Sequence, residues 1–321
     1  MENGKIAAFG EIMMRLAASN GTIADSTSFD ACYGGTEANI LACLSQLGHK
    51  TEYLSALPDT ELGRAVLAHL HGFGVGTDKV IVKGDTLGLY FSETGKGSRG
   101  ANVIYYRKNS EIAKLDENAY DLDTVFDGVS LFHISGISFA LSDGSRRLAF
   151  ALVDAAKKRG VPVSFDFNYR SRLWSIETAK PILKAAAEKA DIILAATIDL
   201  NTFLNTTEDE FFNNYGAKYL IVRDRKVIDE KTHSVRIAVH RRDGGKYETP
   251  TFNFNVTERV GGGDAFDGGV LHSILKGDDI AAAAKFGAAA FVLKHSIAGD
   301  TFVGIEADVI KMRDKLFAKG E

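Results

Sequence analysis

The chain has 321 residues, of which 45% are hydrophobic and 25% charged, and its net charge is −4. This composition is typical of a soluble globular enzyme, and the lack of a basic surplus argues against nucleic acid or an anionic membrane as a partner. The first apolar run, Ile6–Phe9, is too short for a signal peptide or a membrane span, so we expect a cytoplasmic protein. Cys32 and Cys43 lie among small or apolar neighbours, which favours free thiols in a reducing compartment.

Short apolar runs alternate with helix-length amphipathic stretches along the chain. The runs show little alternation, which is typical of strands buried on both faces; they are Lys5–Phe9, Val129–Ile134, Val161–Phe167, Asp191–Ala195 and Tyr219–Val222. Helices are predicted between them at Glu37–Leu47, Glu61–Phe73, Ser145–Lys158 and Ile176–Lys189. This order predicts an α/β fold with a mostly parallel central sheet and helices on both of its faces.

Two polar, strand-like regions interrupt that order. Residues 85–108 contain an alternating, glycine-punctuated hairpin pattern, and residues 14–33 are similar in character. Together they predict a small antiparallel lid over one edge of the main sheet. Residues 234–254 form a further β-rich stretch. Four prolines and no Ser/Pro-rich linker favour a single domain over residues 1–321, with the lid inserted in it.

A glycine cluster, Gly261-Gly262-Gly263, precedes a predicted helix at Asp264–Leu275. Glycines let backbone amides approach a ligand closely, and a helix N-terminus adds free N–H groups and the positive end of a dipole. The pattern predicts an anion hole for a phosphate in transit, with the Asp264 carboxylate beside it to take a proton from an attacking hydroxyl. The alternative is a plain glycine turn in which Asp264 caps the helix.

A second glycine pair, Gly34-Gly35, precedes the helix that carries Asn39 one turn inside it. The glycines would let the backbone approach sugar hydroxyls, which Asn39 would bind from the helix. A turn followed by a helix with an incidental polar residue is the alternative.

A third segment, Asp166–Arg170, ends a buried strand with polar side chains. Ligands of open α/β folds bind at the carboxyl edge of parallel strands, which makes Asn168 and Arg170 candidate ligands. A guanidinium is a natural partner for a carboxylate, so Arg170 indicates an acidic ligand better than a neutral sugar. A surface ion pair is the alternative. No P-loop sequence occurs, and the eight histidines lack metal-ligand spacing.

These segments, in this order, resemble the ribokinase (PfkB-type) family of carbohydrate kinases. The resemblance runs nearly end to end, through Gly10-Glu11, the Gly-Gly-x-x-x-Asn helix, Asp59–Gly63 and the late Gly-x-Gly-Asp. It implies a three-layer α/β/α ribokinase-like fold with a β-sheet lid, and ATP and Mg²⁺ as cofactors. It also implies Asp264 as the catalytic base, Gly261, Gly262 and Gly263 as the anion hole, and a homodimer formed through the lid.

Within the family, the details are most similar to 2-keto-3-deoxygluconate kinases, through Phe9–Arg15, Gly88–Tyr90, Tyr105–Arg107, Asp166–Trp174 and Lys294–Asp300. By that likeness the keto-acid would contact Tyr90, Tyr105, Arg107 and Arg170, with Arg170 facing its carboxylate.

Three segments depart from the family pattern. Glu258-Arg259 stands where Asp-Thr is common, Ala196–Asp199 replaces an Asn-x-x-Glu that supports magnesium, and Arg223–Arg225 replaces a Thr-x-Gly of the nucleotide loop. The likeness leaves Asp199 to support magnesium through water, and Arg223 to contact the nucleotide together with Gly261 and Gly263.

We therefore expect an ATP-dependent kinase that converts a keto-deoxy sugar acid, 2-keto-3-deoxygluconate, to its 6-phosphate by phosphorylating the primary hydroxyl. One alternative is a kinase of a neutral sugar such as fructose or ribose, against which the arginines speak. Another is a non-catalytic sugar- or nucleotide-binding protein on the same fold, suggested by the altered Asp199 and Arg223 segments. A dehydrogenase is discarded, because Gly10–Met13 stands where its glycine fingerprint should follow the first strand.

Overall fold

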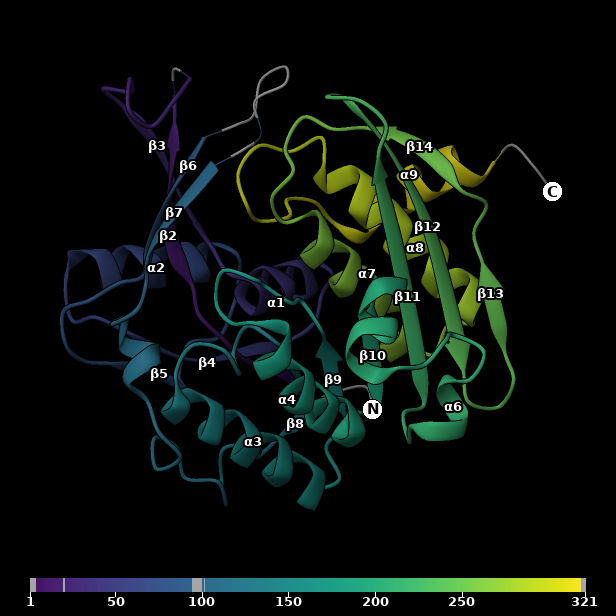
Figure 1. Ribbon diagram of the computed structural model, residues 1–321, viewed down its shortest axis with the longest axis horizontal. Helices are drawn as coiled ribbons and strands as arrows, with labels where there is room; N and C mark the ends of the chain where they lie inside the picture. Colours follow the sequence, from purple (N-terminus) through teal and green to yellow (C-terminus); the bar gives the residue numbers. More distant parts are fainter. Residues whose placement is uncertain (1–3, 20, 94–99, 101, 319–321) are drawn as a thin grey trace.

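A computed structural model describes residues 4–19, 21–93, 100 and 102–318 of the chain. The chain forms a large sheet with helices on both faces and a second, smaller sheet that projects from one side (Figure 1). The predicted three-layer α/β/α fold with a β-sheet lid is confirmed.

The main sheet has 10 strands, in the order β13-β12-β11-β10-β9-β8-β1-β4-β5, and β14 also pairs with β12. Its parallel part consists of β5 (Val80–Val82), β4 (Thr51–Leu57), β1 (Lys5–Phe9), β8 (Val129–Ser135), β9 (Val163–Asp166), β10 (Ile192–Ala195) and β11 (Tyr219–Val227). The antiparallel extension consists of β12 (Thr232–Arg241), β13 (Lys246–Glu248) and β14 (Phe252–Asn255). The central strands β4, β9 and β10 are buried along their whole length, as strands covered on both faces should be.

Helices on the two faces of this sheet enclose two separate apolar clusters. On one face lie α3 (Asp143–Lys158) and α4 (Ile176–Lys189), whose leucines pack against β8 and β9. On the other face lie α1 (Thr36–Gln46), α2 (Glu61–Gly72), α7 (Gly262–Lys276) and α8 (Ile280–Lys294), with α9 (Glu306–Phe317) packed outside α8 (Figure 1). Short helical turns occur at η1 (Glu111–Lys114), α5 (Thr197–Asp199), η2 (Leu200–Leu204) and α6 (Phe211–Asn214).

The lid is the smaller sheet, in the strand order β3-β2-β6-β7. Its strands are β2 (Met13–Ala18), β3 (Phe29–Gly34), β6 (Leu89–Glu93) and β7 (Asn102–Tyr106). The prediction of a wholly antiparallel lid is wrong in one respect: β2 and β6 pair in parallel, because each belongs to a different hairpin. Residues 20, 94–99 and 101 of the predicted lid segments lie outside the described residues.

Other sequence predictions compare as follows. Helix α3 begins at Asp143 and not at Ser145, because the Ser142 side chain caps it by accepting a hydrogen bond from the Ser145 amide. Strands β4 and β5 and helices α8 and α9 were not predicted. Both cysteines are free thiols, as expected. Among the described residues, no helix has the length and apolar character needed to cross a membrane.

Candidate active site

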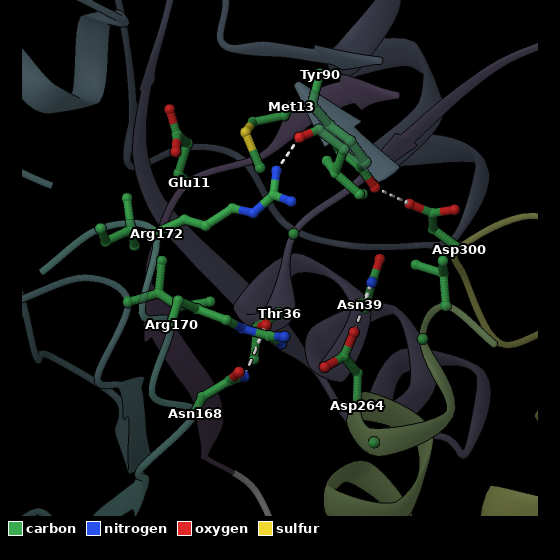
Figure 2. A pocket seen from close by; sticks show the side chains of 18 of the residues that line it. Glu11, Met13, Thr36, Asn39, Tyr90, Asn168, Arg170, Arg172, Asp264 and Asp300 are labelled. Carbon is green, nitrogen blue, oxygen red and sulfur yellow. Dashed lines mark hydrogen bonds between the residues drawn. The ribbon is translucent and has the colours of Figure 1, made fainter. Parts of the chain in front are cut away.

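A cleft of about 1420 Å³ lies between the lid and the carboxyl ends of the parallel strands. Its lining side chains include those of the lid strands, the loop after β9 and the first turns of α1 and α7 (Figure 2), together with residues of β11, α5 and α8. Segments far apart in the sequence therefore converge on one space. Every residue predicted to bind or transfer a phosphate or a sugar lines this cleft, with the exception of Gly262.

The N-terminus of α7 opens into the cleft. Gly261 caps the helix with a positive φ of 78°, and no side chain caps the free amides of the first turn. A Cβ at Gly261 would lie 1.8 Å from the carbonyl oxygen of Asp300, so only glycine fits this turn. Gly261 and Gly263 line the cleft, whereas a Cβ at Gly262 would lie 2.1 Å from the His295 ring. The turn thus places Gly261, Gly263 and the positive end of the α7 dipole beside the cleft, where an anion could bind.

The Asp264 carboxylate lies in the first turn of α7 and accepts a hydrogen bond of 2.7 Å from the Asn39 side-chain amide (Figure 2). Asn39 is on α1, so this bond joins two of the predicted segments across 225 residues of sequence. Burial raises the pKa of Asp264, while the Asn39 hydrogen bond and the positive charges of Arg170 and Arg223 lower it. The carboxylate is held in place and is able to accept a proton from a hydroxyl bound in the cleft.

The loop after β9 provides the opposite side of the site. Asn168 has a positive φ of 35°, and its side-chain amide donates to the Thr36 hydroxyl at 3.0 Å (Figure 2). Arg170 is exposed in the cleft and forms no ion pair within the described part of the chain. Gly34 and Gly35 border the same space, and a Cβ at Gly35 would lie 1.9 Å from the Glu11 carbonyl oxygen.

The lid contributes the three aromatic and basic residues expected there. The Tyr90 hydroxyl donates to Asp300 at 3.1 Å (Figure 2), and the rings of Tyr90 and Tyr105 are 5.5 Å apart. Arg107 lies 5.7 Å from the Tyr105 ring and forms an ion pair with the buried carboxylate of Glu11. The Arg107 guanidinium therefore already has a protein partner, Glu11, which no local sequence pattern predicted.

At the other end of the cleft, Arg223 lies against the glycine turn. Its guanidinium carbon is 5.1 Å from the Phe266 ring and 5.4 Å from the Phe291 ring, and a Cβ at Gly263 would lie 3.0 Å from one of its terminal nitrogens. Aromatic rings thus orient this cation without neutralising it.

Asp199, at the same end, lines the cleft and accepts a hydrogen bond of 2.8 Å from the Ala196 amide. Burial raises the pKa of Asp199, and that of the nearby Asp166. Among the described residues, no group of three or more His, Cys, Asp or Glu side chains is placed to hold a metal ion, so Asp199 is a candidate only for an indirect contact with Mg²⁺, through water.

Sequence reasoning missed a buried ion-pair cluster that borders the site. Arg15 of β2 pairs with Asp300 at 2.7 Å and with Glu258 at 3.1 Å, which joins the lid to the C-terminal loops. Arg15 and Asp300 belong to segments that carried the family resemblance. Each is a charged residue among apolar or small neighbours, which indicates a buried ion-pair partner. The partner itself could not be identified, because the pair is separated by 285 residues and no local sequence pattern relates the two.

Comparison with known proteins agrees with this geometry. The sequence profile described as pfkB family carbohydrate kinase matches residues 3–304. A 2-dehydro-3-deoxygalactonokinase from Haloferax volcanii is 32% identical over 311 residues, which are 93% of this chain and 93% of that protein. A 5-dehydro-2-deoxygluconokinase from Geobacillus thermodenitrificans is 28% identical, over 83% of this chain and 79% of its own length.

The fold gives the same result. The crystal structure of a 2-dehydro-3-deoxygluconokinase from Thermotoga maritima superposes with a TM-score of 0.93 at 32% identity, covering 97% of this chain and 99% of that one. The profile match, the full-length relatives and the convergence of Asp264, Asn39 and the α7 turn in one cleft lead to the same conclusion: the chain belongs to the pfkB family of carbohydrate kinases.

Proposed function

We propose that the protein is an ATP-dependent kinase that phosphorylates the primary hydroxyl of a keto-deoxy sugar acid, with 2-keto-3-deoxygluconate and its 6-phosphate as the first pair to test. The observation that carries the choice of an acid is Arg170, whose guanidinium has no ion pair with any described residue and shares a cleft with the candidate base Asp264. The relatives act, by their names, on keto-deoxy sugar acids, which supports the same substrate class.

In this proposal the sugar acid lies between the lid and the β9 loop. Its carboxylate faces Arg170, and its hydroxyls lie near Asn39, Asn168 and the backbone of Gly34-Gly35, with Tyr90, Tyr105 and Arg107 above it. Charge-assisted pairing with Arg170 fixes the acid end, so that the hydroxyl at the other end is brought to Asp264. Asp264 takes the hydroxyl proton as the oxygen attacks, while Asn39 holds the carboxylate in place.

The nucleotide is proposed to lie across the start of α7. The amides of Gly261 and Gly263 and the helix dipole stabilise the phosphoryl group in transit, and Arg223 contacts the donor's phosphates. Mg²⁺, with Asp199 as a partner through water, would supply charge neutralisation to the phosphates. Closure of the lid would exclude water and limit hydrolysis of ATP.

The deciding experiment is an ADP-release assay with Mg-ATP across three keto-deoxy sugar acids, fructose and ribose. A specificity constant for one keto-deoxy acid at least ~100-fold above that for the neutral sugars is expected from a charge-assisted contact. Preference for a neutral sugar would identify the protein as a fructokinase- or ribokinase-like enzyme. If none of the tested compounds causes ADP release although ATP binds measurably, a non-catalytic binding protein would be favoured.

We also propose a homodimer formed through the lid. Strand β7 is an edge of the lid sheet, and its Ile104 and Tyr106 side chains are 41% and 63% exposed. An exposed apolar edge strand is a suitable surface for pairing with a second copy. Sedimentation of the wild type and of Ile104→Lys tests this: the wild type should be dimeric and the variant monomeric.

A further inference from the structure

Lys294, the last residue of α8, is completely buried. Its ammonium group donates hydrogen bonds to two backbone carbonyl oxygens, those of Ile297 at 3.0 Å and Gly299 at 2.8 Å. Burying a charged ammonium costs free energy unless it is hydrogen-bonded or paired. A side chain that carries this cost in the middle of a fold usually has a specific task there.

The segment Lys294–Asp300, here called the supporting loop, lies directly beneath the glycine turn of the active site. The amides of Thr257 and Glu258, just before the turn, donate to the His295 carbonyl oxygen at 2.8 and 3.1 Å. Gly261 lies against the carbonyl of Asp300. The Lys294 side chain completes this contact, because its Cε would be 3.1 Å from a Cβ at Gly261.

The charge of Lys294 is not cancelled by a direct ion pair. Among the described residues, no carboxylate lies within 4.0 Å of its ammonium, and the two nearby acids, Glu258 and Asp300, are paired with Arg15. Lys294 does not line the cleft, so its positive charge is placed behind the turn that would receive a phosphate. In that position it adds to the positive end of the α7 dipole.

We infer that Lys294 is a positioning residue for phosphoryl transfer: it ties the supporting loop together beneath the Gly261 turn and contributes a fixed positive charge behind the donor's phosphates. The inference rests on the proposed kinase function and goes beyond it, since Lys294 touches neither substrate. The same charge acts on the base, because Lys294 is one of the groups that lower the pKa of Asp264.

The test compares the variants K294M and K285M with the wild type. Methionine is similar in length to lysine but carries no charge. Lys285 is a matched control on the same helix, where its ammonium lies over the Tyr247 and Phe317 rings. Calorimetry measures the affinity for Mg-ATP and for adenosine, in the absence of any sugar. We expect K294M to bind Mg-ATP about tenfold more weakly and adenosine normally, the scale of one partly buried charge at a helix terminus. K285M should match the wild type for both.

The pH profile of kcat/KM separates an electrostatic role from a purely structural one. Without the lysine charge the pKa of Asp264 rises, so the acid limb of the profile should move to higher pH in K294M. Arg170, Arg223, Asp166 and Asp267 also act on Asp264, but they are the same in both proteins and do not contribute to the difference. A lower rate with an unmoved acid limb would overturn the electrostatic part of the inference.

If K294M fails to fold, K294A is purified with methylammonium, which fits the space that the ammonium vacates. Added methylammonium should then restore Mg-ATP affinity, whereas methanol, a neutral molecule of similar size, should not. Equal effects of the two additives would overturn the inference. If K294M and the wild type bind Mg-ATP with equal affinity, the inference about Lys294 is overturned and the proposed function is not affected. If the wild type does not bind Mg-ATP, the proposed function is overturned as well.

Discussion

The two walls of the cleft use their arginines differently. On the lid wall, Arg15 is paired with Asp300 and Glu258, and Arg107 is paired with Glu11. On the core wall, five guanidiniums line the cleft and form no ion pair with any described residue; they are Arg170, Arg172, Arg223, Arg225 and Arg259. A paired guanidinium mainly holds the protein together, whereas an unpaired one in a cleft is available to a ligand's carboxylate or phosphate. The paired arginines of the lid wall therefore mainly stabilise the fold, whereas the unpaired arginines of the core wall are available to a ligand's charged groups.

The largest expected effect is on the core wall, from Asp264→Asn. Asparagine keeps the shape of the side chain and can still accept the hydrogen bond from Asn39, but it cannot take a proton. Turnover in the ADP-release assay should therefore fall by roughly 10²–10⁴-fold, the usual scale for a positioned general base. Calorimetry should show unchanged affinity for Mg-ATP. Turnover close to that of the wild type would show that Asp264 is not the base.

On the lid wall the largest effect should be on stability, from Arg15→Met. The change leaves the buried carboxylate of Asp300 without its partner, which should lower the free energy of unfolding by about 3–5 kcal/mol. Arg64→Met is the matched control, because Arg64 pairs with Glu61 at 2.6 Å on the surface, where water screens the pair and its loss should change the stability little. Urea denaturation measures both. A similar loss in the two variants would remove the basis for a structural lid wall.

Arg170→Ala should affect recognition and leave stability unchanged. Its KM for a keto-deoxy acid should rise about 10- to 100-fold, the range for losing a hydrogen-bonded charge, while kcat/KM for neutral sugars stays constant. Arg172→Ala is the control, because Arg172 donates to the Val103 carbonyl of the lid and its loss should affect all sugars alike. Steady-state kinetics on both substrate classes decides, and equal losses for the two classes in Arg170→Ala would make Arg170 structural.

The smallest effect concerns a buried acid behind the core wall. Asp267 is buried next to Asp166, and no described group donates a hydrogen bond to either of its carboxylate oxygens, so a hydrogen bond between the two acids requires a proton on one of them. Burial and the nearby carboxylate raise the pKa of Asp267, so the folded protein keeps a proton that the unfolded chain loses above pH ~3.9. Wild-type stability therefore falls as the pH rises from there toward the raised pKa.

Asp267→Asn lacks this proton equilibrium. Relative to the wild type it should gain on the order of 1 kcal/mol in unfolding free energy at pH 8, and little at pH 4. Urea denaturation at the two pH values measures the difference. A gain of equal size at both would mean that Asp267 does not hold its proton.

Local patterns were enough to predict some of the core-wall residues, whereas Arg223 and Asp199 were predicted only from the family resemblance. A glycine turn before a helix indicates a place where a ligand can approach the backbone, and so do polar residues at the end of a buried strand. Neither pattern depends on the rest of the chain, and the residues predicted from them, Asp264, Asn39 and Arg170, all line the cleft. The main parallel strands were predicted for the same reason: strands such as β9 and β10 are continuously apolar because both faces are covered.

What could not be predicted depends on pairing between distant segments. The Arg15 and Arg107 ion pairs join residues that no local pattern relates, and so does the parallel contact of β2 with β6. Helix α8 was missed because it is apolar almost all round and has little helical periodicity. The close approach of Gly262 to the His295 ring could not be predicted either, because His295 lies 33 residues later in the chain.

The lid joins the core at Gly35, where β3 runs directly into α1. Any side chain at this point would collide with the backbone of Glu11, at the start of the neighbouring lid strand. The place where β3 leaves the core is thus set by two stretches of main chain in contact, those of Gly35 and Glu11. One added methyl group at position 35 would move both β2 and β3, and with them the spacing between Asn39 and the lid, although residue 35 itself would take no part in the chemistry.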